Sequence, residues 1–182
     1  MQLKDRKSLN PQYRKHKPRR SDVNNFISAL KSCLVSIKNA EAKDESEEFM
    51  KLPITTFLKK TFYRDNLVNT KGRIDLAIYT GQDLNSDVAV IIEAKKPSNK
   101  AEFLSINNIN RKALQELLLY YLRERIDNKN NNIKTLIATN GYEWYLFKGE
   151  DFYKYFYKNI ALVKEYTEWK SNQKDSSKTD LF

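Results

Sequence analysis

The feature that most constrains the fold is a continuous apolar run, Val-Ala-Val-Ile-Ile at residues 88–92. Because it is rich in β-branched residues and does not alternate with polar ones, it predicts a strand that is covered on both faces. Such a strand needs helices on either side, so we expect an α/β protein. The run continues into Glu93-Ala94-Lys95-Lys96-Pro97, and Pro97 is expected to end the strand.

Hydrophobic periodicity predicts the elements around this strand. Helices are predicted over residues 22–38, 109–127, 150–157 and 161–169, with a further N-terminal helix that begins or kinks at Pro53. Strands are predicted over Ile74–Tyr79 and in a hairpin of Thr135–Thr139 with 142–147, and loops over 66–71 and 80–87. The pair Asn140-Gly141 favours a two-residue type I′ turn in that hairpin. We therefore expect a small mixed β-sheet flanked by helices, with an N-terminal helical region.

Composition excludes several kinds of chemistry. The chain has four scattered glycines, one histidine (His16) and one cysteine (Cys33) in 182 residues. Glycine-rich phosphate loops, histidine-based metal cages, Ser-His-Asp triads and disulfides are therefore not expected. No apolar run is long enough to span a bilayer and the N-terminus is charged, so we expect no membrane association and a cytoplasmic location.

The positive charge is concentrated at the N-terminus. The formal net charge of the chain is +10, and residues 1–20 carry eight lysines and arginines against Asp5 alone. This basic arm could contact nucleic-acid phosphates or could be a solvated tail, and charge alone favours neither. We expect a folded domain over residues 21–170 and a polar tail or linker over 171–182.

The candidate site consists of Asp75 on one predicted strand and Glu93 and Lys95 on the next. Glu93 and Lys95 are two residues apart, so both side chains leave the same face of the sheet. If the strands are neighbours, Asp75 lies beside Glu93, and two close carboxylates require a proton or a cation. Mg²⁺ suits two acids, waters and a substrate phosphate, which predicts metal-assisted phosphodiester hydrolysis. Lys95 would orient the attacking water or stabilise the developing negative charge.

Less specific explanations of the same residues remain open. Charged residues are common where a strand ends in solvent, and such a strand end would explain Glu93 and Lys95 without any chemistry. Gln115 shares a helix face with several leucines, where its amide could satisfy a backbone group in the core or reach the scissile phosphate. The aromatic residues Tyr142, Trp144 and Tyr145 could form a stacking surface for RNA, although their alternation favours core packing.

Four segments together resemble the PD-(D/E)XK nuclease family. They are Gly72-Arg73-Ile74-Asp75, residues 90–97, Ala113-Leu114-Gln115 and the run Thr-Asn-Gly-Tyr-Glu-Trp at 139–144. More narrowly, the chain resembles the N-terminal cleavage domain of type IIG restriction–modification enzymes. It is more distantly similar to the nuclease domain of the type I restriction endonuclease subunit. The similarity covers nearly the whole chain, with Ile74 where the family signature has proline.

The resemblance implies a restriction-endonuclease-like core and Mg²⁺-dependent cleavage of double-stranded DNA, with Mn²⁺ as a possible substitute. It implies Asp75, Glu93, Lys95 and Gln115 as catalytic residues and Asp75 and Glu93 as metal ligands. Glu47 or Glu48 would match an auxiliary acid. Methyltransferase and DNA-recognition modules are absent from this chain, and a homodimer would allow both strands to be cut.

Contacts to the DNA backbone are expected from Lys96, Lys100, Arg111 and the basic arm. The alternative function is a catalytically inactive nuclease-like module that binds nucleic acid or assembles with a protein partner.

Overall fold

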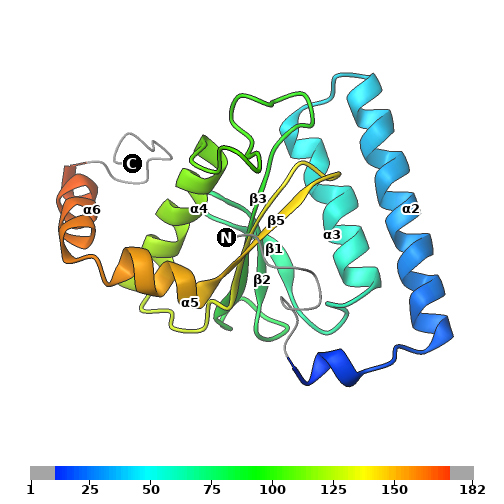
Figure 1. Ribbon diagram of the computed structural model, residues 1–182, viewed down its shortest axis with the longest axis horizontal. Coiled ribbons are helices and arrows are strands. Elements are labelled where there is room, and N and C mark those ends of the chain that lie inside the picture. The colour runs from blue at the N-terminus through cyan, green and yellow to red at the C-terminus, as the bar shows by residue number, and fades with distance from the viewer. Residues whose placement is uncertain (1–10, 173–182) are drawn as a thin grey trace.

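The computed structural model describes residues 11–172 and confirms a mixed α/β architecture in which helices flank a five-stranded sheet (Figure 1). The strands are β1 (Val68–Lys71), β2 (Ile74–Tyr79), β3 (Val88–Ala94), β4 (Thr135–Thr139) and β5 (Trp144–Lys148). Their order in the sheet is their order in the sequence. Only β3 and β4 pair in parallel, and the other three neighbouring pairs are antiparallel.

The helices form a layer on each face of the sheet (Figure 1). Those before the sheet are η1 (Tyr13–Lys15), α2 (Arg20–Ala42), η2 (Glu47–Met50) and α3 (Lys51–Lys60). Helix α4 (Lys112–Leu122) continues as a π-helical turn, η3 (Arg123–Asp127), and carries the chain from β3 to β4. After β5 come α5 (Gly149–Phe152), the π-helical η4 (Tyr153–Tyr157) and α6 (Ile160–Asn172). At this coarse level the architecture agrees with a restriction-endonuclease-like core.

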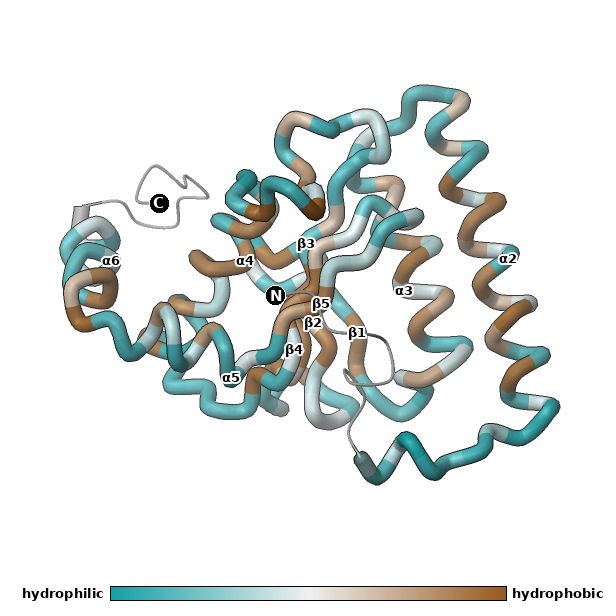
Figure 2. The backbone as a smooth tube through the Cα atoms, viewed as in Figure 1, coloured by the Kyte–Doolittle hydropathy of each residue, from teal (hydrophilic) through white to brown (hydrophobic). Residues whose placement is uncertain are grey.

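Alternation along β3 divides the hydrophobic core in two. Val90 and Ile92 pack with α2 and α3, whereas Ile91 packs with α4. The hydrophobic colour of Figure 2 is accordingly concentrated along the central strands. Because both faces of β3 are covered, its continuous apolar run is confirmed as a doubly buried strand. By the same alternation, Glu93 and Lys95 emerge on the α4 side.

The sequence prediction of a loop over residues 66–71 was wrong, because β1 forms there. Its residues are Val-Asn-Thr-Lys, of which only Val68 is buried, and it pairs with β2 through an irregular register. An edge strand with one buried side chain lacks both the alternation by which β2 is recognised and the continuous apolar run by which β3 is recognised. Gly72, at φ +57°, occupies the turn that joins it to β2.

Helix boundaries differ from the expected ones at several ends. Helix α2 covers Arg20–Ala42 instead of residues 22–38. The helix expected to start or kink at Pro53 begins at Lys51, so Pro53 lies in its first turn, where no backbone N–H is needed. Helix α4 begins at Lys112 instead of residue 109, after an extended Arg111. At the C-terminal end, α6 continues through Asn172, so the first two residues of the expected tail are helical. The rest of that tail, 173–182, and residues 1–10 of the basic arm lie outside the described residues.

The hairpin of β4 and β5 exists, but its expected two-residue type I′ turn was wrong. Thr139 pairs with Trp144, which leaves a four-residue connection between the strands. The Asn140 side chain accepts hydrogen bonds from the backbone N–H groups of Tyr142 (3.0 Å) and Glu143 (2.7 Å). This side-chain interaction holds a longer turn, because asparagine can replace a backbone partner locally.

Candidate active site at the C-terminal end of β3

The C-terminal end of β3 brings three of the four predicted site residues together. Leu76 of β2 pairs with Ile92 of β3, so Asp75 and Glu93 are the next positions across the two strands. The Asp75 carboxylate accepts a hydrogen bond from the backbone N–H of Ala94 at 3.0 Å. Glu93 and Lys95 are only 2% and 4% exposed. The charged groups therefore lie inside the protein and not on a solvated strand end.

Lys95 lies at the centre of a group of carboxylates. Its ammonium nitrogen is 2.7 Å from Glu93 Oε1, 2.8 Å from Glu116 Oε2 and 3.7 Å from Glu47 Oε2. The backbone of Lys95 is fixed as well, since its N–H donates to the Thr139 carbonyl at 2.9 Å. A strand, a helix and the η2 turn thus converge on one buried amine.

These carboxylates keep Lys95 protonated. Burial alone would lower the pKa of Lys95, but the charges of Glu93 and Glu116 and their hydrogen bonds outweigh it and raise the pKa above its ordinary value. In this arrangement Lys95 is a fixed positive charge and a hydrogen-bond donor. It can orient a water or stabilise an anion, but it cannot accept a proton.

The pKa of Glu93 is raised as well, which for a carboxyl group favours the neutral form. Burial raises its pKa well above the ordinary value, the negative charges of Asp75 and Glu116 add to the rise, and Lys95 opposes it. Its Oε2 atom is buried and receives no hydrogen bond from any donor within the described residues. A carboxylate oxygen in that position is stabilised by a proton or by a cation.

Asp75 is held by the first turn of α3. Its Oδ1 atom is 3.1 Å from the ammonium of Lys51, while Oδ2 takes the Ala94 N–H. Burial would lower the pKa of Lys51, but Glu48 and Asp75 raise it above its ordinary value. Asp75 therefore already has a cationic partner, which a metal ion would have to share or displace.

The structure distinguishes the two candidate auxiliary acids. Glu47 points into the site, where Oε1 accepts the Lys96 N–H at 3.0 Å and Oε2 faces Lys95. Glu48 instead pairs with Lys51 at 2.5 Å, and its side chain is 72% exposed. Only Glu47 is in a position to act beside Lys95.

Gln115, the fourth predicted residue, does not join this group. It is only partly buried, and its amide donates to the Asn110 side chain at 3.2 Å. The residue that reaches Lys95 from α4 is its neighbour Glu116, which sequence reasoning missed. Tyr120, one turn further along α4, lies near the same charges, and its pKa is raised by burial and then by Glu93, Glu116 and Asp75.

The residues present fit a divalent cation that is only partly ligated by protein. Among residues 11–172, no group of three or more histidine, cysteine, aspartate or glutamate side chains forms a metal cage. Asp75 and Glu93 are adjacent, however, and the buried Oε2 of Glu93 has no donor. Mg²⁺ commonly uses one or two carboxylates and takes its other ligands from water and substrate phosphate.

The comparison with protein families gives one match. A model described as "Domain of unknown function (DUF7149)" matches residues 3–182. The chain belongs to this family. No curated protein and no solved structure matches it. The search for membrane spans found no helix within the described part of the chain that is long and apolar enough to cross a bilayer.

Proposed function

We propose that this DUF7149 chain is a Mg²⁺-dependent endonuclease domain that hydrolyses phosphodiester bonds in double-stranded DNA. One observation carries the proposal: Glu93, adjacent to Asp75 across two strands, has a buried oxygen that no donor of residues 11–172 contacts, and the Lys95 ammonium lies 2.7 Å from its other oxygen. Two acids and a lysine in this order resemble the PD-(D/E)XK site. The mixed sheet between helices supports the same family.

Each side chain has a chemical role in this proposal. Asp75 and Glu93 would hold Mg²⁺ or Mn²⁺, which supplies Lewis-acid activation of water and neutralises charge on the phosphate. Lys95, kept protonated by Glu93 and Glu116, would donate to the attacking water or to a phosphate oxygen. Glu116 and Glu47 would act through Lys95 as positioning residues. Gln115 remains a candidate only if it leaves Asn110 when DNA binds.

The proposal includes partners of the nuclease domain. A restriction–modification system requires methyltransferase and DNA-recognition modules, which we propose reside elsewhere. A pair of these domains would allow both strands of a duplex to be cut, and such a system would act on foreign DNA in the cytoplasm.

A second function is favoured by one specific contact. The Lys51 ammonium, 3.1 Å from Asp75, already neutralises one of the two proposed ligands. If a metal ion does not displace Lys51 from Asp75, the domain would bind nucleic acid or a protein partner without cutting. The two functions differ in whether metal binding and cleavage occur.

The test is cleavage of supercoiled plasmid by the purified chain with Mg²⁺ or with chelator. Asp75→Asn removes a proposed ligand from a partly exposed position. Removing Lys95 alone would leave buried carboxylates uncompensated at a cost of about 3–5 kcal/mol, so Lys95→Gln is paired with Glu116→Gln to preserve the net charge. Asp87→Asn is the matched control, because the Asp87 carboxylate also accepts a hydrogen bond, from the Asn132 side chain, but Asp87 precedes the first residue of β3, at the opposite end of that strand.

We expect nicking or linearisation that requires metal, persists in Asp87→Asn and is lost in both site variants while DNA binding is retained. Unchanged cleavage by Asp75→Asn would refute the site. Metal-independent DNA binding without cleavage by the wild type, even when Mn²⁺ replaces Mg²⁺, would favour the second function.

A further inference from the structure

A pocket of about 220 Å³ lies beside the candidate active site. Its lining combines cationic, polar and apolar side chains, which include Lys100, Arg111, Asn140, Glu143, Pro97 and Phe103. None of these six residues belongs to the carboxylate group around Lys95. The pocket is therefore a separate feature whose occupant has to be inferred from its own chemistry.

The backbone joins the pocket to the site on three sides. Pro97 follows Lys95 by two residues, and Asn140 follows Thr139, whose carbonyl accepts the Lys95 N–H. Arg111 immediately precedes α4, the helix that carries Glu116. The segments that hold Lys95 thus also form the pocket walls, so a ligand in the pocket would lie next to the reacting group.

The cationic part of the pocket is formed by Arg111 and Lys100. Arg111 is anchored by a 3.3 Å hydrogen bond from Nη1 to the Ala101 carbonyl, and its buried Nε has no hydrogen-bond partner among residues 11–172. Lys100 lines the same pocket and is exposed. A guanidinium and an ammonium that line one pocket match the oxygens of a phosphate group.

The rest of the pocket matches a nucleobase. Pro97 and Phe103 supply apolar walls, and Phe103 is fixed by an edge contact with Tyr145 at 5.7 Å between ring centroids. Glu143 offers a carboxylate held by Asn140 at 3.3 Å. A carboxylate accepts hydrogen bonds from the exocyclic amino group of cytosine or adenine but not from thymine O4, which is itself an acceptor.

We propose that this pocket holds one nucleotide of a DNA strand next to the scissile phosphate, with its phosphate on Arg111 and Lys100 and its base toward Glu143. The inference rests on the proposed nuclease function and names the part of the substrate that this pocket recognises. The nucleotide must leave its stack to enter, so unpaired strands bind more readily than duplex.

Binding measurements in chelator test this inference without requiring cleavage. The probes are dCMP, dTMP, inorganic phosphate and a short single-stranded oligo-dC, titrated into the full chain. We expect Arg111→Gln and, separately, Lys100→Gln to weaken dCMP and oligo-dC binding, by about tenfold for Arg111. Lys154→Gln, an exposed cation on η4, is the control and should change neither affinity.

Several results would overturn the proposal. Inorganic phosphate binding as tightly as dCMP would mean a simple anion site, and oligo-dC binding unaffected by both variants would mean that the pocket takes no part in strand binding. Wild-type protein should prefer dCMP to dTMP by several-fold, and Glu143→Gln should abolish that preference; equal binding by the wild type would contradict the assignment of Glu143.

The outcomes for the pocket and for nuclease function can be told apart. Wild-type cleavage together with unchanged nucleotide binding by Arg111→Gln would reject the pocket alone. Nucleotide binding that depends on Arg111, together with a wild type that does not cleave, would reject the nuclease function alone.

Discussion

At the scale of single residues, the site depends on a balance of buried charges. Lys95 faces three carboxylates, while Asp75 is paired with Lys51. Negative groups therefore outnumber positive ones around Glu93, and the excess is what raises the pKa of Glu93 beyond the effect of burial. This excess charge is unfavourable without a ligand, and a divalent cation would remove it.

The raised pKa of Glu93 predicts how stability depends on pH. Between its ordinary and its raised native pKa, the folded chain holds a proton that the unfolded chain releases, so stability falls as pH rises. Lys95 adds no slope below about pH 10, because its pKa is raised above an already high ordinary value. We expect Glu93→Gln to gain stability relative to wild type as pH increases from 5 to 8, with a slope of at most about 1.4 kcal/mol per pH unit.

Urea unfolding in chelator at several pH values measures this difference. Glu165→Gln, at an exposed position on α6, is the matched control. A stability difference between Glu93→Gln and wild type that does not change with pH would show that Glu93 does not hold a proton in the native state.

Alternation predicted that Glu93 and Lys95 share a face, and it placed Asp75 beside Glu93 on the condition that the two strands are neighbours, which they are. Asp75, Glu93 and Lys95 follow from strand geometry, because a strand places every second side chain on one face. Glu116 could not be found in the same way. Helix α4 is buried at Ala113 and throughout residues 116–122, so its hydrophobic pattern does not define which face meets the sheet. Gln115 and Glu116 were therefore indistinguishable by periodicity.

At the scale of elements, the connection from β4 to β5 anchors α2 and η2 against the sheet. Gly141, at φ +87°, has its amide bonded to Thr139 Oγ1 at 2.9 Å. A Cβ on Gly141 would lie 2.5 Å from Ile37 Cδ1 and 3.1 Å from Met50 Cε. The sequence indicated a turn at Asn140-Gly141, but it could not reveal this close packing, which depends on segments far apart in the chain.

Gly141→Ala is expected to destabilise the fold by about 2–3 kcal/mol, since it combines backbone strain with a contact that the ends of the Ile37 and Met50 side chains must move to relieve. Gly72→Ala is the matched control, because Gly72 has φ +57° but a Cβ added there would have no heavy atom within 4 Å. We expect about 1–2 kcal/mol at Gly72, from backbone strain alone. Denaturant unfolding measures both, and equal losses would contradict the packing role of Gly141.

The predicted order of elements was confirmed, apart from β1. Strands with continuous or alternating apolar residues and helices with apolar stripes were recognisable because burial fixes their periodicity. β1 pairs only with β2, and three of its four residues are polar. The backbone hydrogen bonds of β1 are formed with β2, and no pattern within residues 68–71 predicts that pairing.

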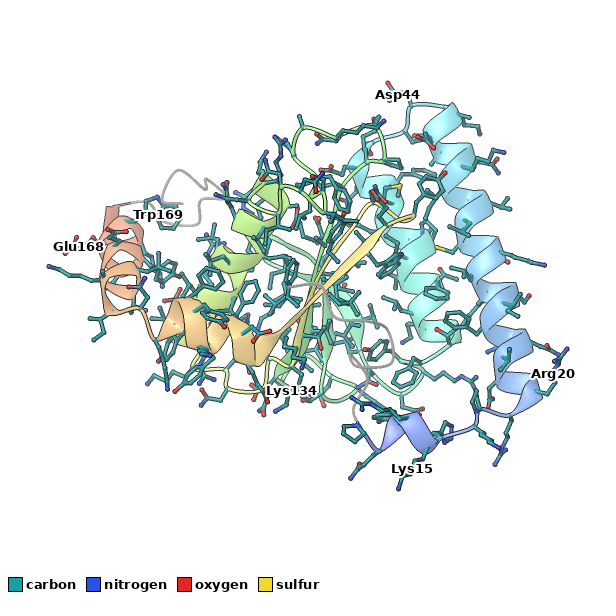
Figure 3. All side chains as sticks on the ribbon, in the orientation of Figure 1. Lys15, Arg20, Asp44, Lys134, Glu168 and Trp169 are labelled. Atoms are coloured by element: carbon teal, nitrogen blue, oxygen red, sulfur yellow. The ribbon has the colours of Figure 1, made fainter. Side chains whose placement is uncertain are left out.

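At the scale of the whole molecule, the described part of the basic arm lies far from the site. Figure 3 shows Lys15 and Arg20 at one end of α2 and Asp44 beyond the other. Asp44 pairs with Lys96 at 2.8 Å, next to Lys95, so the site lies at the Asp44 end. The 23 residues of α2 span about 34 Å, which is about ten base pairs of duplex.

This separation predicts that the arm adds affinity only on DNA that is long enough to reach from the site to the arm. On a 24-base-pair duplex, Lys15→Gln with Lys17→Gln should reduce the slope of log affinity against log salt by about 1.8, or about 0.9 for each lost phosphate contact. Both residues are exposed, so folding should not change. Lys154→Gln with Lys164→Gln is the control, and fluorescence anisotropy measures the slope. An identical slope for both pairs would mean that the arm is a solvated tail.

The most direct test of the central claim is Mn²⁺ binding, because it does not depend on partner modules or on finding the right DNA. The loss of the free Mn²⁺ electron paramagnetic resonance signal reports the bound ion. We predict saturable binding of one Mn²⁺ per chain by wild type and by Asp87→Asn, with binding lost in Asp75→Asn and in Glu93→Gln. Absence of saturable binding by the wild type, or binding unchanged in Asp75→Asn, would contradict a cation site shared by β2 and β3.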